Sequence, residues 1–544
     1  MASHAIVDTE QTEPSYLDTV GRHSGLFSWI FSTDHKRISI LYMVSMLSFF
    51  VVGMTIGVLM RIEQLSMGRT IMDPHTYNVM FTLHGVIMIF LFIIPGIPAA
   101  FGNFILPLQL GAKDVAFPRL NLLSWWLYLI GAIVAVTSLF IGSGGADTGW
   151  TFYAPYSLRT NSNVIMAVSA AFILGFSSIL TGLNFVTTIH RMRAPGMGWF
   201  RMPLFAWSLY ATGWIQILAT PVIGITLVLV ILERVFHIGV FDPTIGGDPI
   251  LFQHLFWIYS HPAVYIMILP GMGVVTEIIP TFARRTIFGY KAIAYSSMAI
   301  AAVGSLVWGH HMFVSGQSYT ADVMFSLLTF LVAIPSAIKV FNWTATLYKG
   351  SITLEPPLLF ALGFIFLFMI GGFTGLMLGA IALNVHLHDT YFVVGHFHYV
   401  MFGGTGFAVF AALHYWLPKI TGKMYNKKIA SIGAVIMLVG FNMLYFTFLV
   451  LGYLGMPRRY YDHLPRFHHL QVFATIGSWI LVMGILLVFY NLWRGLRYGE
   501  KAPANPWNGT TLEWQVPSPP PLENFEEIPV VDSEPYDHKR GSAR

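Results

Sequence analysis

The sequence predicts an all-α membrane protein, a bundle of about twelve transmembrane helices with both termini in the cytoplasm. Only 10% of its 544 residues are charged and 55% are hydrophobic, whereas a soluble protein carries about 25% charged residues. Twelve apolar stretches each reach the roughly 20 residues that cross a ~30 Å hydrocarbon core. Lysine and arginine are concentrated in alternate loops, which by the positive-inside rule places both termini on the cytoplasmic side.

The twelve apolar stretches follow one another along most of the chain. They cover residues 38–60, 80–107, 123–142, 164–189, 204–232, 252–280, 291–314, 321–348, 356–382, 391–416, 428–452 and 470–493. We therefore expect a cytoplasmic N-terminal segment at 1–37, one membrane domain at 38–493 and a cytoplasmic tail at 494–544. Because the tail is rich in proline, it is expected to lie extended on the surface or on a partner.

Composition limits the chemistry that the chain can carry out. There is no cysteine, which excludes disulfides, iron–sulfur clusters, thiolate zinc and any copper centre that needs Cys. Twenty histidines are left as the ligands for a borderline or soft metal. The net charge of +5 reflects the cytoplasmic lysines and arginines, and we expect the lipid bilayer, not nucleic acid, as the surrounding partner.

Six histidines from four of the expected helices fall at a similar depth in the outer half of the bundle. A lone buried histidine is usually a satisfied core residue. Six in one layer of hydrocarbon predict metal binding, because ionisable groups there are costly and usually functional. The six are His84, His261, His310, His311, His396 and His398.

Helical spacing divides these histidines between metals. Residues two apart on a helix point about 200° apart, so His396 and His398 cannot share a metal and predict two cofactors on either side of one helix. With His84 available, one cofactor can take two axial histidines and the other keeps an open face. His310 and His311 diverge by about 100° on a regular helix. They can share a metal only if it lies between them or if the helix end is irregular.

Tyr265 is four residues after His261, hence on the same helical face one turn away. A phenol beside a metal-bound imidazole can donate a proton and an electron. The alternative is an ordinary buried tyrosine with a hydrogen-bond partner.

With these residues in view, the chain resembles the catalytic subunit of the haem-copper oxygen reductases. Matching strings run in the family's order from the second apolar stretch to the tail. They are TLHGVIMIF (82–90), QHLFWIYSHPAVY (253–265), WGHHMF (308–313), IPSAIKVFNW (334–343), HDTYFVVGHFHYV (388–400), MPRRY (456–460) and WQVPSPPPLENF (514–525).

The resemblance implies two haems and one copper ion, CuB, inside the membrane domain. His84 and His398 would ligate a low-spin haem, and His396 a high-spin haem whose open face meets the copper. Haem A is expected for both. The copper would be held by His261, His310 and His311, with Tyr265 cross-linked to His261 as donor of an electron and a proton.

The resemblance also assigns residues at the outer surface. Arg458 and Arg459 would pair with haem propionates, although two cations at an outer helix end need no such role. His388 and Asp389 resemble the family's magnesium or manganese site, which another subunit completes. By themselves they would be a polar loop.

Two proton routes are implied from the cytoplasmic side. Lys339 lies where a cation costs about 2.5–3.5 kcal/mol, and with Ser336 on the same face it matches the family's lysine-lined path. A lysine that reaches the interface is the alternative. Asp114, with Asn103 and Asn121 nearby in sequence, matches the mouth of a second path, although a solvated loop aspartate would look the same.

One departure concerns the end of that second path. Where the family often has a glutamate in HPEVY, this chain has Ala263, which cannot carry a proton. Tyr259 and Ser260 resemble the subclass in which a Tyr-Ser pair replaces the acid. Tyr259 is four residues before Ala263, so its hydroxyl can occupy the same face one turn away.

The electron donor is expected to be cytochrome c. Quinol-using relatives have His and Gln eight and five residues before the first haem ligand, and here those places hold Thr76 and Val79. Because this chain lacks cysteine, the dinuclear copper centre that accepts the electrons must lie on a subunit II. Subunit III-like and other membrane subunits are expected as well. A quinol-oxidising enzyme is the alternative.

Two other function classes are weighed against this one. A nitric oxide reductase shares the fold, but Tyr265 and Lys339 are not expected there. A histidine-rich metal or ion transporter would show internal repeats and broken helices, and neither is visible. The sequence shows no targeting segment, so the bacterial inner membrane is the expected location.

The Tyr-Ser pair gives a first prediction. Tyr259→Phe should impair turnover or proton pumping more than Ser260→Ala, because the tyrosine hydroxyl can occupy the position of the missing acid. Proton uptake by the purified variants measures this. Wild-type uptake in both variants would refute the substitution of the acid by this pair.

Overall fold

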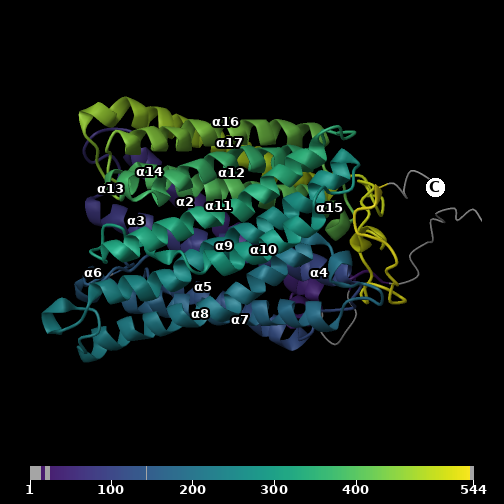
Figure 1. Ribbon diagram of the computed structural model, residues 1–544, viewed down its shortest axis with the longest axis horizontal. Helices are drawn as coiled ribbons and strands as arrows, with labels where there is room; N and C mark the ends of the chain where they lie inside the picture. The colour runs from purple at the N-terminus through teal and green to yellow at the C-terminus, as the bar shows by residue number, and fades with distance from the viewer. Residues whose placement is uncertain (1–13, 19–24, 143, 539–544) are drawn as a thin grey trace, which may run out of the picture.

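The computed structural model describes residues 14–18, 25–142 and 144–538. Within these residues all the regular secondary-structure elements are helices. The long helices lie side by side along the longest axis of the molecule (Figure 1). An isolated bridge pairs Ser15 with Pro521, so the first and last described segments meet at one end of the bundle. We call this the terminal end and the other the opposite end.

Eleven helical spans in the described residues are long and apolar enough to cross a membrane. They are α2 (His35–Glu63), α3 to α4 (Pro74–Leu110), α5 (Pro118–Thr137), α7 (Val164–Arg191), α8 (Leu204–Phe236), α9 (Pro249–Ala283), α11 (Tyr319–Leu347), α12 (Pro356–Gly379), α14 to α15 (Tyr391–Thr421), α16 (Lys427–Tyr453) and η7 to α17 (Pro465–Tyr498).

A twelfth crossing is made of two pieces. The helix α10 (Tyr290–Gly304) has 15 residues, or about 22 Å, which is short of a ~30 Å core. The chain then continues through the short 3-10 helix η5 (Trp308–Met312) before α11 begins. The stretch expected at 291–314 is therefore a helix with an irregular end, and the prediction of an all-α bundle of about twelve crossings is confirmed.

The two spans that carry haem-ligand candidates contain π-helical turns. In the α3 to α4 span, η1 (Ile87–Ile93) and η2 (Gly96–Gly102) follow α3 (Pro74–Val86) and precede α4 (Asn103–Leu110). In the other span, η6 (Met401–Gly406) joins α14 (Tyr391–Val400) to α15 (Phe407–Thr421). Such turns occur often at functional sites.

The remaining elements are short and lie between the crossings. They are α1 (Phe27–Ile30), α6 (Tyr156–Arg159), α13 (Ile381–Leu387), η3 (Trp199–Arg201), η4 (Pro243–Ile245), η7 (Pro465–Phe467), which leads directly into α17 (His468–Tyr498), and η8 (Leu512–Trp514).

Local sequence explains where many crossings begin. Asp34, Asp73 and Asp248 precede α2, α3 and α9, and each carboxylate accepts a backbone N–H of the first turn at 2.8 Å. Pro74 and Pro249 follow directly, where proline is tolerated because its missing N–H would have no partner. Polar caps therefore mark the ends of crossings at the membrane surface.

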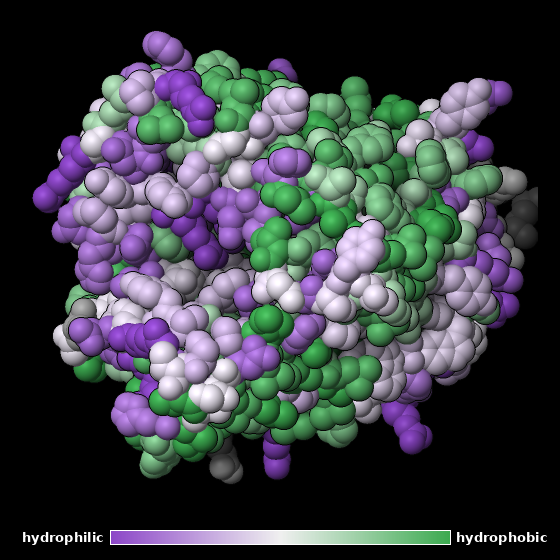
Figure 2. All heavy atoms as spheres, turned by 60° about the vertical axis from the view of Figure 1, so that its left-hand side comes forward, coloured by the Kyte–Doolittle hydropathy of each residue, from purple (hydrophilic) through white to green (hydrophobic). Residues whose placement is uncertain are grey.

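Lipid-compatible side chains cover the flanks. Hydrophobic residues spread over the sides of the bundle, whereas hydrophilic ones gather toward the opposite end, which comes forward in Figure 2. The helix α11 exposes Leu327, Leu331 and Phe341, while α9 and the α14 to α15 span are mostly buried. This arrangement identifies a multi-pass membrane protein whose central helices are shielded from lipid.

The tail folds back on the terminal end of its own bundle. The helix α17 continues to Tyr498, past the expected end of the membrane domain at 493. Beyond it the Lys419 ammonium donates to the carbonyls of Ala504 at 2.8 Å and Val516 at 2.5 Å, and Trp507 Nε1 donates to Tyr415 O at 2.8 Å. The tail was expected to lie on the surface or on a partner. In the structure it lies on the surface of this same chain.

Glycines allow close packing of the last two crossings. A Cβ on Gly440 of α16 would overlap the backbone of Ile480 and Leu481 in α17, whereas one on Gly224 of α8 would lie 3.5 Å from Phe172, an ordinary contact. Gly440→Ala should therefore lower stability by about 1–3 kcal/mol through overpacking. Gly224→Ala, the control, should be neutral. Thermal unfolding in detergent measures both, and equal midpoints would contradict this account of the packing.

Candidate metal centre

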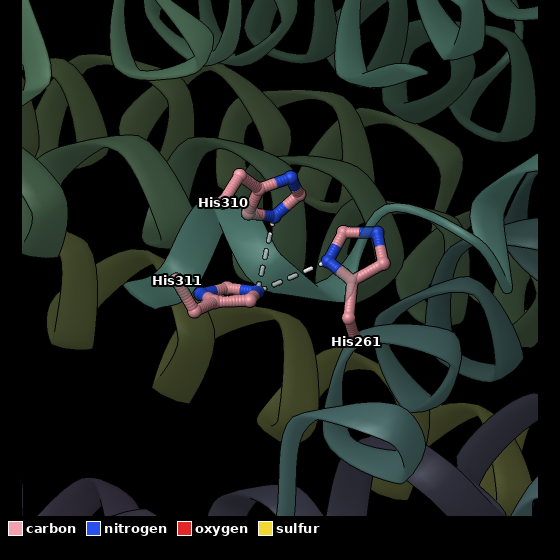
Figure 3. Close-up of side chains that lie close together, drawn as sticks. All are labelled: His261, His310 and His311. Carbon is pink, nitrogen blue, oxygen red and sulfur yellow. Dashed lines mark hydrogen bonds between the residues drawn. The ribbon is translucent and has the colours of Figure 1, made fainter. Parts of the chain in front are cut away.

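Three imidazoles converge inside the bundle (Figure 3). His261 comes from α9 and His310 and His311 from η5. His261 Nδ1 lies 3.0 Å from His311 Nε2, and His310 Nε2 lies 3.1 Å from the same atom. Their ligand atoms all lie within 4.8 Å of one another. Such a set of neutral nitrogens suits copper or zinc.

The irregular end of the α10 crossing brings neighbours 310 and 311 to one place. The Thr329 hydroxyl donates to Phe325 O at 2.6 Å, so at 2.8 Å it accepts the proton of His310 Nδ1. That leaves His310 Nε2 with a lone pair for a metal. The His311 ring stacks on Trp257 with centroids 3.7 Å apart and planes at 9°. Such contacts orient metal ligands.

His261 presents its two nitrogens differently. Nδ1 faces His311, whereas Nε2 is buried and has no hydrogen-bond partner among the residues that the structure describes. The nearest aromatic neighbour on the same helix is Tyr265, whose ring centroid lies 4.8 Å away at 66°. Gly304 leaves room for that ring, since a Cβ there would overlap it.

A second pair of imidazoles faces each other between α3 and α14. The ring centroids of His84 and His398 are 6.4 Å apart. His84 Nδ1 donates to Gly53 O and His398 Nδ1 to Val394 O, each at 2.9 Å, which leaves both Nε2 atoms as acceptors. The spacing fits one metal bound at about 2 Å by each ring, so these residues fit a haem iron with two axial histidines.

His396 faces the other side of α14. Its Nδ1 lies 3.0 Å from both Gly371 O and Thr374 Oγ1 of α12. A Cβ on Gly375 would lie 3.0 Å from the ring, so the missing side chain on α12 leaves room for the imidazole. With Nδ1 fixed, Nε2 is again the ligand atom. The structure thus places His396 and His398 back to back, as the spacing predicts.

The arginines and the acidic pair lie together at the opposite end. Arg458 Nε is 3.3 Å from Asp389 Oδ1, and its backbone N–H donates to Asp389 O at 2.9 Å. Arg459 donates to Thr151 Oγ1 at 3.4 Å. Burial, and then Arg458, lower the pKa of Arg459 to about 10. Two crowded cations with one carboxylate form a site that attracts anions.

His388 and Asp389 form only part of a metal site. His388 Nε2 lies 3.6 Å from Asp389 Oδ2. Within residues 14–18, 25–142 and 144–538, the group His261, His310 and His311 is the one set of three or more candidate ligands.

Lys339 has a hydrogen-bond partner that the sequence analysis missed. Lys339 is buried and its Nζ donates to Ser297 Oγ of α10 at 2.8 Å, whereas Ser336 donates to Val332 O of its own helix at 3.1 Å. Ser297 lies 42 residues from Lys339 in sequence. Only the pairing of α10 with α11 would have revealed it.

The loop between α4 and α5 carries Asp114, whose carboxylate accepts the Val115 N–H at 2.6 Å. Burial raises the pKa of Asp114 to about 7. Asn103 and Asn121 are buried nearby in sequence, and the side chain of Asn121 has no hydrogen-bond partner in the described residues. Asn184 of α7, which the sequence analysis missed, bonds both the N–H and the carbonyl of Phe117.

A small cavity with several polar side chains in a largely apolar lining lies within the bundle. It has about 20 Å³, enough for one water molecule. Its polar lining comes from Tyr42, Ser177, Ser178, Thr181 and Gln216.

Tyr259 and Ser260 are both buried in α9, and Ser260 Oγ has no partner in the described residues. Nothing in these contacts ranks one hydroxyl above the other.

Comparison with known proteins decides the family. The model of the family described as "Cytochrome C and Quinol oxidase polypeptide I" matches residues 37–480. The chain belongs to this haem-copper oxidase subunit I family. Cytochrome c oxidase subunit 1 of Synechocystis sp. is 46% identical over 93% of this chain and 92% of its own length. The protein of the same name from Thermostichus vulcanus is 43% identical over 96% of both chains.

A solved structure shares the fold of this oxidase subunit. A heme-copper terminal oxidase dimer studied by cryo-EM matches with a TM-score of 0.67 at 22% identity, over 86% of this chain and 84% of that one. The oxidase subunit is thus an oxidoreductase of the respiratory chain that reduces O2 in a terminal oxidase. The transporter and quinol-oxidase alternatives are not favoured.

The contact of Thr329 with His310 gives a prediction for the metal centre. Thr329→Val keeps the shape of the side chain but removes the acceptor for His310 Nδ1. Metal affinity should fall by about tenfold or more, since partners of ligating histidines have effects of about 10–100-fold. Copper per haem in the purified, chelator-treated oxidase measures it.

The matched control is Thr344→Val on the same helix. Thr344 donates to the carbonyl four residues earlier, Val340 O, at 2.9 Å, and is exposed. Its copper content should stay at the wild-type level. Equal copper in the two variants would show that Thr329 does not hold the ligand.

Proposed function

We propose that this oxidase subunit reduces O2 to water with electrons from cytochrome c and couples the reaction to proton translocation. The observation that carries the proposal is the position of two histidine sites on α14, one facing His84 and one facing α12, beside the three-imidazole cluster. When bound, two haems and one copper supply electron storage and the metal that receives O2.

The histidines divide the ligand positions among the three metals. His84 and His398 hold the low-spin haem, and His396 holds the high-spin haem. His261, through Nδ1, holds CuB together with His310 and His311. Hydrogen bonds from Nδ1 to backbone carbonyls or threonine hydroxyls hold the rings in place before any cofactor binds. This lowers the entropic cost of binding.

Tyr265 supplies a proton and an electron at the copper side of the site. Its ring centroid lies 4.8 Å from that of His261, and we infer a covalent bond between the phenol ring and Nε2, the His261 nitrogen that has no hydrogen-bond partner in the described residues. Forming the bond removes one hydrogen from each ring, and O2 at the same site is the oxidant that accepts them. The linkage holds the phenol next to the reacting oxygen.

Protons reach the site from the terminal end. Lys339 and Ser297, with Ser336, supply one path toward Tyr265. Asp114 opens the other, past Asn103 and Asn121 and the small cavity, toward Tyr259 and Ser260 in α9. With a pKa near 7, Asp114 can both hold and release a proton at neutral pH.

The opposite end completes the oxidase. Arg458 and Arg459 neutralise the haem propionates, and His388 and Asp389 bind magnesium or manganese with ligands from another subunit. The haems are haem A. The metals lie in the membrane domain at 38–493, between cytoplasmic segments 1–37 and 494–544, in a bacterial inner membrane.

Partner subunits follow from the composition. Because the chain has no cysteine, a subunit II carries the dinuclear copper centre that receives electrons from cytochrome c. A subunit III-like chain and other membrane subunits complete the assembly. Thr76 and Val79 stand where quinol-using relatives have His and Gln, which supports cytochrome c over quinol.

The test compares donors on the purified assembly. Oxygen consumption should be rapid with reduced cytochrome c and at background with a quinol. A pyridine haemochrome assay should give two haem A per copper bound in the membrane domain. Turnover with quinol instead, or a haemochrome of another type, would contradict the donor or the haem assignment respectively.

A further inference from the structure

Asn524, a residue of the tail, is hydrogen-bonded to the backbone of the loop that carries Asp114. Asn524 is fully buried. Its Nδ2 lies 2.9 Å from Ala112 O, 3.0 Å from Lys113 O and 2.9 Å from His35 Nε2. Ala112 and Lys113 are the two residues directly before Asp114. A residue 20 positions from the C-terminus therefore fixes the loop that carries this carboxyl group.

The orientation of the Asn524 amide is determined by its neighbours. Its Oδ1 lies 2.7 Å from Lys36 Nζ, which can only donate. Its Nδ2 faces two carbonyls, which can only accept. A flipped amide would place oxygen against both carbonyls and nitrogen against the ammonium, so the contacts match in one orientation alone.

The same amide reaches Asn103 through His35. His35 Nδ1 lies 2.6 Å from Asn103 O, so it carries the proton and leaves Nε2 to accept from Asn524. Asn103, His35, Asn524 and the 112–113 backbone thus form one chain of hydrogen bonds. This chain links the two ends of the proposed proton mouth, Asp114 and Asn103.

Charges around Asp114 depend on the same residue. The buried Lys36 ammonium is held by Asn524 Oδ1, by Leu522 O at 2.9 Å and by Asp34 Oδ1 at 3.1 Å. Lys36 lowers the pKa of Asp114, whereas Asp34 and Glu523 raise it. Moving the ammonium would change the field at the carboxyl group.

The backbone of Asn524 adds a reason for its residue type. Its φ is +64°, in the left-handed region, where asparagine, aspartate and glycine are tolerated and other residues are strained. Variants can therefore change the side chain without forcing the backbone to move.

We infer that Asn524 is a positioning residue for proton uptake: it holds the loop of Asp114 in register with Asn103 and keeps Lys36 beside them. The inference rests on the proposed function, in which Asp114 opens a proton path. A residue that merely fastened the tail would leave proton uptake unchanged as long as the tail stays bound.

The test uses two variants of Asn524 that both suit a positive φ. Asn524→Asp keeps the shape but loses the donors to the loop and to His35. Asn524→Gly removes the side chain and adds no charge. The matched control is Asn505→Asp in the same tail, where Nδ2 donates to Gly509 O and Oδ1 accepts the Gly509 N–H, both at 2.8 Å. Asp114→Asn is the reference for loss of the path.

Proton uptake and oxygen consumption are measured on the whole assembly in vesicles between pH 6 and 9. A displacement of ~1 Å in a reacting geometry can cost about 100-fold, so uptake should fall by about fivefold or more in both Asn524 variants. The pH at which turnover declines should shift in both Asn524 variants and should stay at the wild-type value in Asn505→Asp. Haem spectra and copper content should match the wild type in all.

Different results separate the two proposals. Wild-type uptake in Asp114→Asn would overturn the proposed proton mouth itself. Slow uptake in Asp114→Asn with wild-type uptake and pH profile in both Asn524 variants would overturn the role of Asn524 alone. Slow uptake in Asn524→Asp but not in Asn524→Gly would assign the effect to the added charge and also overturn positioning.

Discussion

The structure depends on how the metal-facing imidazoles are held in a medium without water. His84, His310, His396 and His398 each place Nδ1 at hydrogen-bond distance from a carbonyl or a threonine hydroxyl. That contact satisfies one nitrogen and fixes the other as an acceptor. The orientation of these rings thereby depends on helix packing, since a shift of α12 or α11 would move the group that holds His396 or His310.

The crossings and the histidine layer could be predicted because hydropathy and helical spacing act locally. Each expected apolar stretch has its helix, and His396 and His398 point apart as 200° of rotation requires. For His310 and His311 the spacing leaves two alternatives, a metal between their directions or an irregular helix end. Deciding between them needed the break at Gly304, which leaves no clear trace in an apolar sequence.

What sequence could not supply are partners brought together by packing. Ser297 beside Lys339, Asn184 beside Phe117 and Asn524 beside Ala112 are all separated by long stretches of chain. None has a local signature, because a serine or asparagine in an apolar helix or a tail looks the same whether it is paired or not. Sequence likewise does not choose between the surface of this chain and a partner as the support for the tail, since the contacts with Lys419 are made through backbone carbonyls that every sequence has.

The pairing of residue 524 with residues 35 and 112 has a consequence for biogenesis. All twelve crossings and every metal-ligand candidate are already synthesised when the ribosome still holds the tail. The hydrogen-bond chain of Asn524 joins residues more than 400 positions apart, so it can form only after Asn524 itself has been synthesised. The loop that carries Asp114 therefore gains these hydrogen bonds only after the residues of the membrane bundle have been synthesised.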